Sequence, residues 1–163
     1  MKIGVFYGST MGATEDVAEK IGLILKADVF NIESVSKDLI QSYDFIIAGS
    51  STWGYGDLQD DWSNFFDDFG IPNLNNKKVA IFGLGDQEDH KDVFVNAIGI
   101  LHDIFESSGA TLVGYWPTEG YSYGSNTTAI RDNKFLGLAL DEVNQAQLTD
   151  ERIKKWTNQI VNS

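Results

Sequence analysis

Short runs of almost continuously apolar residues, set between segments with helical spacing, constrain the fold of this chain more than any other feature. The runs are rich in β-branched and aromatic residues, which is typical of strands buried on both faces of a parallel sheet. They occupy residues 3–7, 29–32, 45–49, 79–84, 111–115 and 135–140. In the intervening segments apolar residues recur every three or four positions, as in Val17, Ile21 and Leu25. This alternation predicts an α/β fold, a doubly wound parallel sheet with helices on both faces.

The composition narrows the classes of function. We expect a single domain over residues 1–163, because this length can bury a sizeable core and no linker or repeat interrupts it. The chain has no cysteine, which excludes disulfides, thiol catalysis and iron–sulfur clusters, so redox chemistry would need a bound organic cofactor. The first residues lack signal-peptide features and no run is long enough for a membrane span, so we expect a soluble, cytoplasmic protein.

The charge of the chain is strongly negative. Lys and Arg total 12 against 24 Asp and Glu, a formal net charge of −12. This balance argues against nucleic-acid or membrane-surface binding and favours partners with basic surfaces. Acidity can equally serve solubility alone, so the charge by itself leaves both explanations open.

Residues 116–134 break the regular alternation. The segment is polar, rich in Gly, Ser, Tyr and Asn, and has no helical pattern. Loops this long inside compact domains are often functional. A final helix is expected to begin near Thr149, whose side chain can cap it, with Asp150 and Glu151 in the first turn.

The predicted topology places ligands at the carboxyl ends of the strands, in the loops after the first, third and fourth apolar runs. The loop after the first run contains Ser9, Thr10, Met11, Gly12, Ala13 and Thr14. Hydroxyls and free N–H groups thus gather at a helix N-terminus, an arrangement that suits a phosphate. The loop matches neither the Walker A pattern nor the dinucleotide fingerprint, which argues against ATP and NAD. Ser, Thr and Gly also suit caps and turns, so a purely structural role stays open.

The other two loops carry planar side chains. After the third run come Thr52, Trp53, Gly54, Tyr55 and Gly56, and after the fourth come Gly85, Asp86 and His90. Two planar groups on opposite loops could sandwich a flat heterocycle, and Asp86 could bind its polar edge. Separately, Trp53 could belong to the core and His90 to the surface. Together with a phosphate loop, the set indicates a site for flavin mononucleotide (FMN).

Three segments resemble the FMN loops of flavodoxins, and the resemblance extends along essentially the whole chain. They are Ser-Thr-Met-Gly-Ala-Thr at 9–14, Thr-Trp-Gly-Tyr-Gly-Asp-Leu at 52–58 and Gly-Leu-Gly-Asp-Gln at 83–87. Residues 116–134 resemble the insertion that splits the fifth strand of long-chain flavodoxins, and 135–142 resemble the sequence that follows it. The resemblance implies a five-stranded, flavodoxin-like sheet with strand order 2-1-3-4-5.

The resemblance also implies roles for individual residues. Residues 9–14 would bind the phosphate through backbone N–H groups and hydroxyls, and Asp86 would meet the pyrimidine edge. Trp53 would cover the inner face of the flavin, and the Gly54–Tyr55 peptide would lie beside its N5 atom. The family usually places tyrosine on the outer face, where this chain has His90. The usual outer-face stacking therefore does not transfer directly to this position.

By resemblance, we expect a monomeric electron carrier that binds FMN non-covalently and has no substrate turnover of its own. It would use the semiquinone–hydroquinone couple at low potential, with flavodoxin reductases and low-potential oxidoreductases as partners. The sequence supplies a reason for the low potential, because six carboxylates lie in or beside the flavin loops and residues 45–76 contain no Lys or Arg. They are Asp57, Asp60, Asp61, Asp86, Glu88 and Asp89.

Two other functions share this topology. An FMN-dependent NAD(P)H:quinone reductase would need a substrate pocket over the flavin, which no motif in the sequence marks. A phosphoacceptor signalling domain would need acidic residues after the first strand and an aspartate ending the third. Those positions read Tyr7-Gly8-Ser9 and Gly49-Ser50-Ser51, which argues against it.

Overall fold

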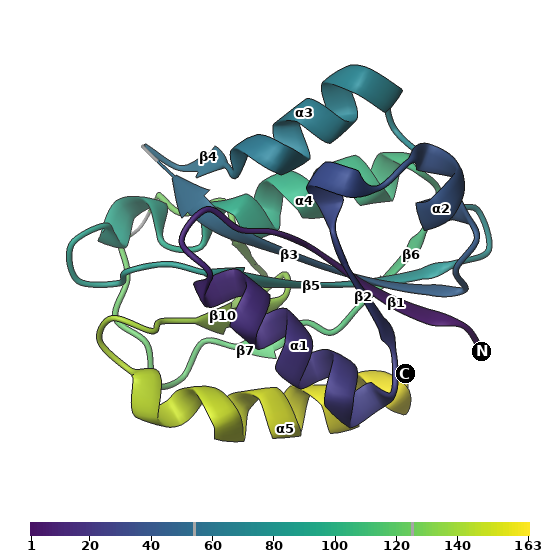
Figure 1. Ribbon diagram of the computed structural model, residues 1–163. Coiled ribbons are helices and arrows are strands. Elements are labelled where there is room, and N and C mark those ends of the chain that lie inside the picture. Colours follow the sequence, from purple (N-terminus) through teal and green to yellow (C-terminus); the bar gives the residue numbers. More distant parts are fainter. Residues whose placement is uncertain (54, 125) are drawn as a thin grey trace.

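A twisted parallel sheet runs through the computed structural model, which describes residues 1–163 apart from Gly54, Ser125 and the side chain of Trp53 (Figure 1). From one edge, the strands are β2 (Asp28–Asn31), β1 (Ile3–Gly8), β3 (Phe45–Trp53), β5 (Lys78–Leu84), and finally β6 (Thr111–Val113) and β10 (Leu138–Leu140). The predicted doubly wound fold and the strand order 2-1-3-4-5 are confirmed, with β6 and β10 sharing the fifth position.

The fifth strand position is built from two separate segments. β6 pairs in parallel with the first half of β5, and β10 pairs in parallel with its second half. The chain between them forms a small antiparallel sheet of order β7-β9-β8, made of β7 (Trp116–Pro117), β9 (Lys134–Phe135) and β8 (Ile130–Arg131). The apolar run 135–140 is therefore divided between two sheets. Gly137 makes the crossing possible, because a Cβ there would lie 2.2 Å from the carbonyl oxygen of Ile81.

Helices cover both faces of the sheet (Figure 1). One face carries α1 (Ala13–Leu25) and α5 (Thr149–Val161); the other carries α2 (Lys37–Gln41), α3 (Asp60–Phe69) and α4 (Asn96–Ser107). Short 3-10 helices occupy Ile32–Ser34, Lys91–Val93 and Ala146–Leu148, and β4 (Asp57–Leu58) pairs antiparallel with the end of β3. Within the described residues, no helix combines the length and the apolar character needed to cross a membrane.

Packing of the helices fixes the carboxyl end of the sheet, where the loops converge. Trp62 on α3 is fully buried and meets Phe105 of α4 edge to face, with ring centroids 5.9 Å apart. Its indole Nε1 donates to the carbonyl oxygen of Gly49 in β3, at 2.8 Å. Full burial of a side chain the size of phenylalanine contributes about 1.5–3 kcal/mol, and tryptophan is larger. The bond to Gly49 also ties α3 to the strand that leads into the candidate site.

The start of α5 differs from the prediction. Thr149 lies inside the helix, with φ −59° and ψ −50°, and Leu148 occupies the cap position without a side-chain cap bond. The Thr149 hydroxyl instead donates to the carboxylate of Glu142, in the turn after β10. The predicted capping role of Thr149 is therefore wrong, because a nearby carboxylate accepts from its hydroxyl. Asp150 pairs with Lys20 of α1, N to O 2.8 Å, and joins the two helices of that face.

Candidate functional site

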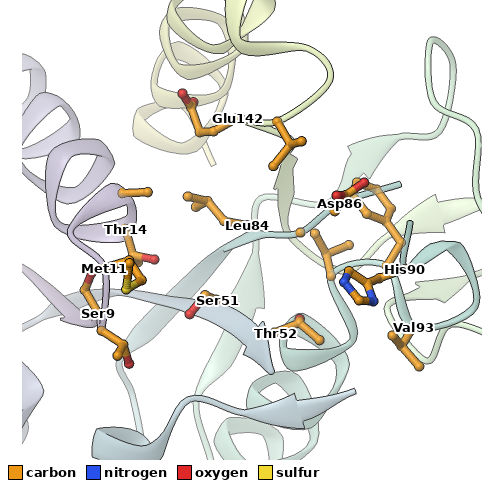
Figure 2. Close-up of a pocket in the computed structure, with 16 residues that line it drawn as sticks. Ser9, Met11, Thr14, Ser51, Thr52, Leu84, Asp86, His90, Val93 and Glu142 are labelled. Atoms are coloured by element: carbon orange, nitrogen blue, oxygen red, sulfur yellow. The ribbon is translucent and has the colours of Figure 1, made fainter. Parts of the chain in front are cut away.

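A cavity of about 460 Å³ opens at the carboxyl ends of the strands. Ser9, Met11 and Thr14 lie on one side of it, and Asp86, His90 and Val93 on the other (Figure 2). Its walls are formed by Ser9, Thr10, Met11, Ala13, Thr14, Ser51, Thr52, Leu84, Gly85, Asp86, His90, Val93, Phe94, Val95, Glu142 and Val143. The volume is in the range of small-molecule sites.

The loop after β1 brings a helix N-terminus to one end of the cavity. Gly12 is the cap residue of α1, in the left-handed region at φ 89°, where glycine meets no Cβ penalty. Its N–H donates to Ser9 Oγ at 3.0 Å, and Gln59 Nε2 donates to Thr10 Oγ1 at 3.2 Å. Glycine gives the first turn of α1 no side-chain cap, which leaves its N–H groups for a ligand or water. With the helix dipole, this end of the cavity suits an anion.

The loop after β5 is held by the carboxylate of Asp86. Its Oδ1 accepts from the backbone N–H groups of Glu88 and Asp89, both at 3.0 Å, and from Asn144 Nδ2 at 2.8 Å. Burial alone would raise the pKa of Asp86, but these hydrogen bonds outweigh it and lower the pKa below its ordinary value. Asp86 is therefore an anion at neutral pH and stands in the cavity wall.

Asp141, at the end of β10, is a fully buried carboxylate that joins two walls of the cavity. Its Oδ2 accepts from Gln87 N at 3.1 Å, Gln87 Nε2 at 2.7 Å and Asn144 Nδ2 at 2.9 Å. Its Oδ1 accepts from Val143 N at 3.1 Å and Asn144 N at 2.9 Å. Burial raises the pKa of Asp141, but the bonds from Asn144 and Gln87 outweigh it, and the net shift is downward. The turn carrying Glu142 and Val143 is thereby fixed against the loop after β5.

The apolar wall opposite α1 ends in a strained turn. Val95 is fully buried, with φ 46° and ψ 31°, a left-handed conformation that is rare for a β-branched residue. Gly85 lies against it, since a Cβ on Gly85 would be 3.0 Å from Val95 N. Such strain costs about 1–3 kcal/mol and tends to persist where the surrounding structure fixes a functional site.

The structure brings most of the predicted site residues together. Nine line the cavity, namely Ser9, Thr10, Met11, Ala13, Thr14, Thr52, Gly85, Asp86 and His90. Gly12, Tyr55 and Gly56 are not among the residues that line the cavity. Gly12 is the left-handed residue before α1, Tyr55 is 98% exposed, and Gly56 is buried against Val93. Gly54 and the Trp53 side chain lie outside the described residues. The ring-stacking role of Trp53 and the peptide role of Gly54–Tyr55 stay predictions.

Seven lining residues were not among the site residues predicted from the sequence: Ser51, Leu84, Val93, Phe94, Val95, Glu142 and Val143. Glu142 and Val143 follow β10, whose carboxyl end lies beside that of β5. Ligands bind at the carboxyl ends of parallel strands, so the loop after β10 could have been predicted as part of the site by the same argument as the other loops. Among the described residues that line the cavity, the charged side chains are the carboxylates Asp86 and Glu142, without Lys or Arg. In the same described part of the chain, no three His, Asp or Glu residues cluster as a metal site would require.

Comparisons with known proteins agree on one family. The flavodoxin family model matches residues 5–156. Flavodoxin of Haemophilus influenzae is 45% identical over 161 residues, which cover 97% of this chain and 92% of that protein. Flavodoxin 2 of Escherichia coli is 44% identical over 166 residues, which cover 99% of this chain and 96% of that protein. The crystal structure of Fusobacterium nucleatum flavodoxin bound to flavin mononucleotide matches with a TM-score of 0.92, at 32% identity, covering 99% of this chain and 97% of that one.

Proposed function

The chain belongs to the flavodoxin family, and we propose on that basis that its cavity binds FMN and that the protein is a one-electron carrier working at low potential. The similarity to the F. nucleatum flavodoxin, which was solved with FMN bound, supports this choice of cofactor. The observation that carries the proposal is a single cavity that joins the N-terminus of α1 to the loop after β5.

The residues present fit the chemistry of FMN. Uncapped N–H groups, the Ser9 and Thr10 hydroxyls and the buried Thr14 stand where a phosphate would be held. Between the two ends the walls are largely apolar, as a flat aromatic ring requires; they include Leu84, Val93, Phe94, Val95 and Val143. Bound FMN would supply the group that accepts and releases electrons, while the protein sets binding, access and electrostatics.

Negative charge around the cavity supports the low potential. Asp86 and Glu142 line it, and Asp57, Glu88 and Asp89 are exposed on the loops beside it. A carboxylate roughly 10 Å from an added electron costs about 0.4–1.7 kcal/mol for effective dielectric constants of about 80 to 20. For one electron this is a depression of about 20–70 mV per carboxylate before salt screening. Several such charges would together make the reduced cofactor a strong electron donor.

The charge of the chain also supports a proposal about partners. With a net charge of −12, it would be attracted to basic surfaces on flavodoxin reductases and low-potential oxidoreductases. We propose that it meets them as a monomer, in the cytoplasm, and binds neither nucleic acid nor membrane. Association rates that fall steeply with ionic strength would support this mode of recognition, and rates insensitive to salt would contradict it.

Stepwise anaerobic reduction of the FMN-loaded protein by dithionite, followed by visible spectroscopy, tests the proposed function. We expect stoichiometric FMN binding and two separate one-electron stages, the second at low potential. A protein that does not take up FMN would overturn the cofactor assignment. Rapid turnover of NADH with a quinone would instead indicate a reductase.

A further inference from the structure

Asn96, the first residue of α4, hydrogen-bonds to two segments that are distant in sequence. Its Oδ1 accepts from Thr128 N at 2.7 Å and from Thr128 Oγ1 at 2.8 Å. Its Nδ2 donates to the carbonyl oxygen of Gly56 at 3.3 Å. A carboxamide accepts on one side and donates on the other, so one side chain satisfies both segments. Asn96 thus links the insertion, residues 116–134, to the chain that follows β3.

The N-terminus of α4 bonds both to Thr52, near the end of β3, and to Gly56, which follows β3. The N–H of Ala97 donates to Thr52 Oγ1 at 3.0 Å, and Thr52 lines the cavity. Gly56 has φ +107° and approaches Asn96 so closely that a Cβ would lie 2.7 Å from Nδ2. The positive φ and the close approach both require glycine here. The positions of Thr52 and Gly56 therefore depend on where α4 begins.

The insertion is fixed to the same part of α4. Thr127 Oγ1 donates to the carbonyl oxygen of Phe94 at 2.6 Å, directly before the strained Val95. A Cβ on Gly99 would lie 2.4 Å from the carbonyl oxygen of Thr128, so the backbone of the insertion rests on the helix. A shift of the insertion would be transmitted to Asn96, because packed segments of this kind move together.

We propose that Asn96 is a positioning residue that couples the insertion to the Gly56 end of the segment after β3, and so sets how tightly the cavity holds the ring of a flavin. The proposal rests on the proposed function, since it takes FMN as the ligand. It assigns a role to the insertion: its Thr127 and Thr128 stabilise the cavity from behind, through α4.

Flavin affinity, measured with FMN and with riboflavin, tests the role of Asn96. Riboflavin has the same ring as FMN and no phosphate. A substitution that alters only the part of the cavity that holds the ring therefore changes the affinities for FMN and riboflavin by the same factor. We expect Asn96→Ala to raise both dissociation constants by about 3- to 10-fold, the effect expected from losing the one bond that holds Gly56. Their ratio should stay within about twofold. Unchanged constants, or a loss confined to FMN, would overturn the proposal.

The wild-type protein separates this test from that of the proposed function. If it binds no FMN, the proposed function fails, whatever Asn96 does. Titrations are made at a temperature where urea unfolding shows each apoprotein to be folded, because a loss of global stability alone then leaves the dissociation constant unchanged. Thr128→Val removes fewer hydrogen bonds than Asn96→Ala, and we expect it to raise the dissociation constants of FMN and riboflavin by a smaller factor. Thr118→Val is the matched control, since that hydroxyl bonds to Asn133 O at 3.4 Å within the insertion and should leave them unchanged.

The double variant tests the coupling itself. If the insertion acts through Asn96, Thr128→Val will add no further loss of affinity once Asn96→Ala is present. Equal effects of Thr128→Val in both backgrounds would show that the insertion reaches the cavity independently, and would overturn the coupling.

Discussion

Replacing Asp141 by asparagine should destabilise the protein far more than an isosteric change usually does. The carboxylate accepts five hydrogen bonds in a fully buried position. An asparagine must turn its NH₂ group toward one set of donors. The smaller set, the N–H groups of Val143 and Asn144, then faces another donor. Asparagine therefore cannot satisfy this position in either orientation.

The magnitude follows from the bonds that are lost. Hydrogen bonds to charged groups contribute about 1.5–3 kcal/mol each, so losing two would cost about 3–6 kcal/mol. Replacing a buried charge by a neutral amide recovers part of this, because less desolvation is needed. We expect the free energy of unfolding of Asp141→Asn to fall by about 2–4 kcal/mol.

Urea unfolding of the apoprotein at about pH 7 measures this difference. Asp132→Asn is a suitable control, because Asp132 is exposed, and its φ of 53° is tolerated by asparagine. The control should change the free energy of unfolding by less than about 0.5 kcal/mol. A loss below about 1 kcal/mol in Asp141→Asn would refute the reasoning that this carboxylate organises the two loops.

The pH dependence of stability provides a second measurement. Since the pKa of Asp141 is lowered in the folded protein, its stabilising contribution is complete above about pH 4, the ordinary pKa of aspartate. It is lost as the pH falls through the lower, folded-state pKa. Asp141→Asn should therefore show a weaker loss of stability in acid than the wild type, and an unchanged acid limb would contradict this account.

Three further predictions concern other parts of the fold. Lys26→Gly should raise the free energy of unfolding by about 0.5–1 kcal/mol in urea, because Lys26 caps α1 at φ 53° and glycine adopts that conformation without a Cβ penalty. Gly49→Ala should lower the free energy of unfolding by about 3 kcal/mol or more, and the melting temperature with it, since its Cβ would lie 1.9 Å from the buried Phe82 ring. Burial raises the pKa of three tyrosines to about 12, so ultraviolet titration should find them protonated at about pH 10.5, and stability should fall from about pH 10 toward 12. They are Tyr7, Tyr43 and Tyr121.

The sheet could be predicted from sequence because parallel strands are buried on both faces and so appear as continuous apolar runs. Strand ends were less predictable, since they depend on contacts distant in sequence. The run 111–115 ends as a strand at Val113, because Gly114 turns at φ +85° and accepts a hydrogen bond from Trp156 Nε1 at 2.8 Å. No local pattern in the run indicates that a tryptophan on the last helix will approach there.

The same distinction applies to the site. Loops with glycines, hydroxyls and rings could be predicted as a group, because each carries its chemistry in consecutive residues. The apolar wall at Val93 and Val95 could not be predicted from the sequence, since valine normally avoids the left-handed region that Val95 adopts. Asp141 also has no local signal of its importance, because its donors come from Gln87 as well as from its own turn.

The divided fifth strand has a consequence for association between copies of the chain. An exposed sheet edge offers unpaired N–H and C=O groups to any other strand, and a long, straight edge invites aggregation. Here the edge at the fifth position is made of β6 and β10, three residues each and separated by the whole insertion, while the opposite edge, β2, has four. β10 is also buried, and the Tyr121 hydroxyl of the insertion donates to its Ala139 carbonyl oxygen at 2.6 Å. Neither edge gives an incoming strand a long ladder. Joining β6 directly to β10 in one strand would lengthen this edge, and we expect such a variant to aggregate more readily during expression.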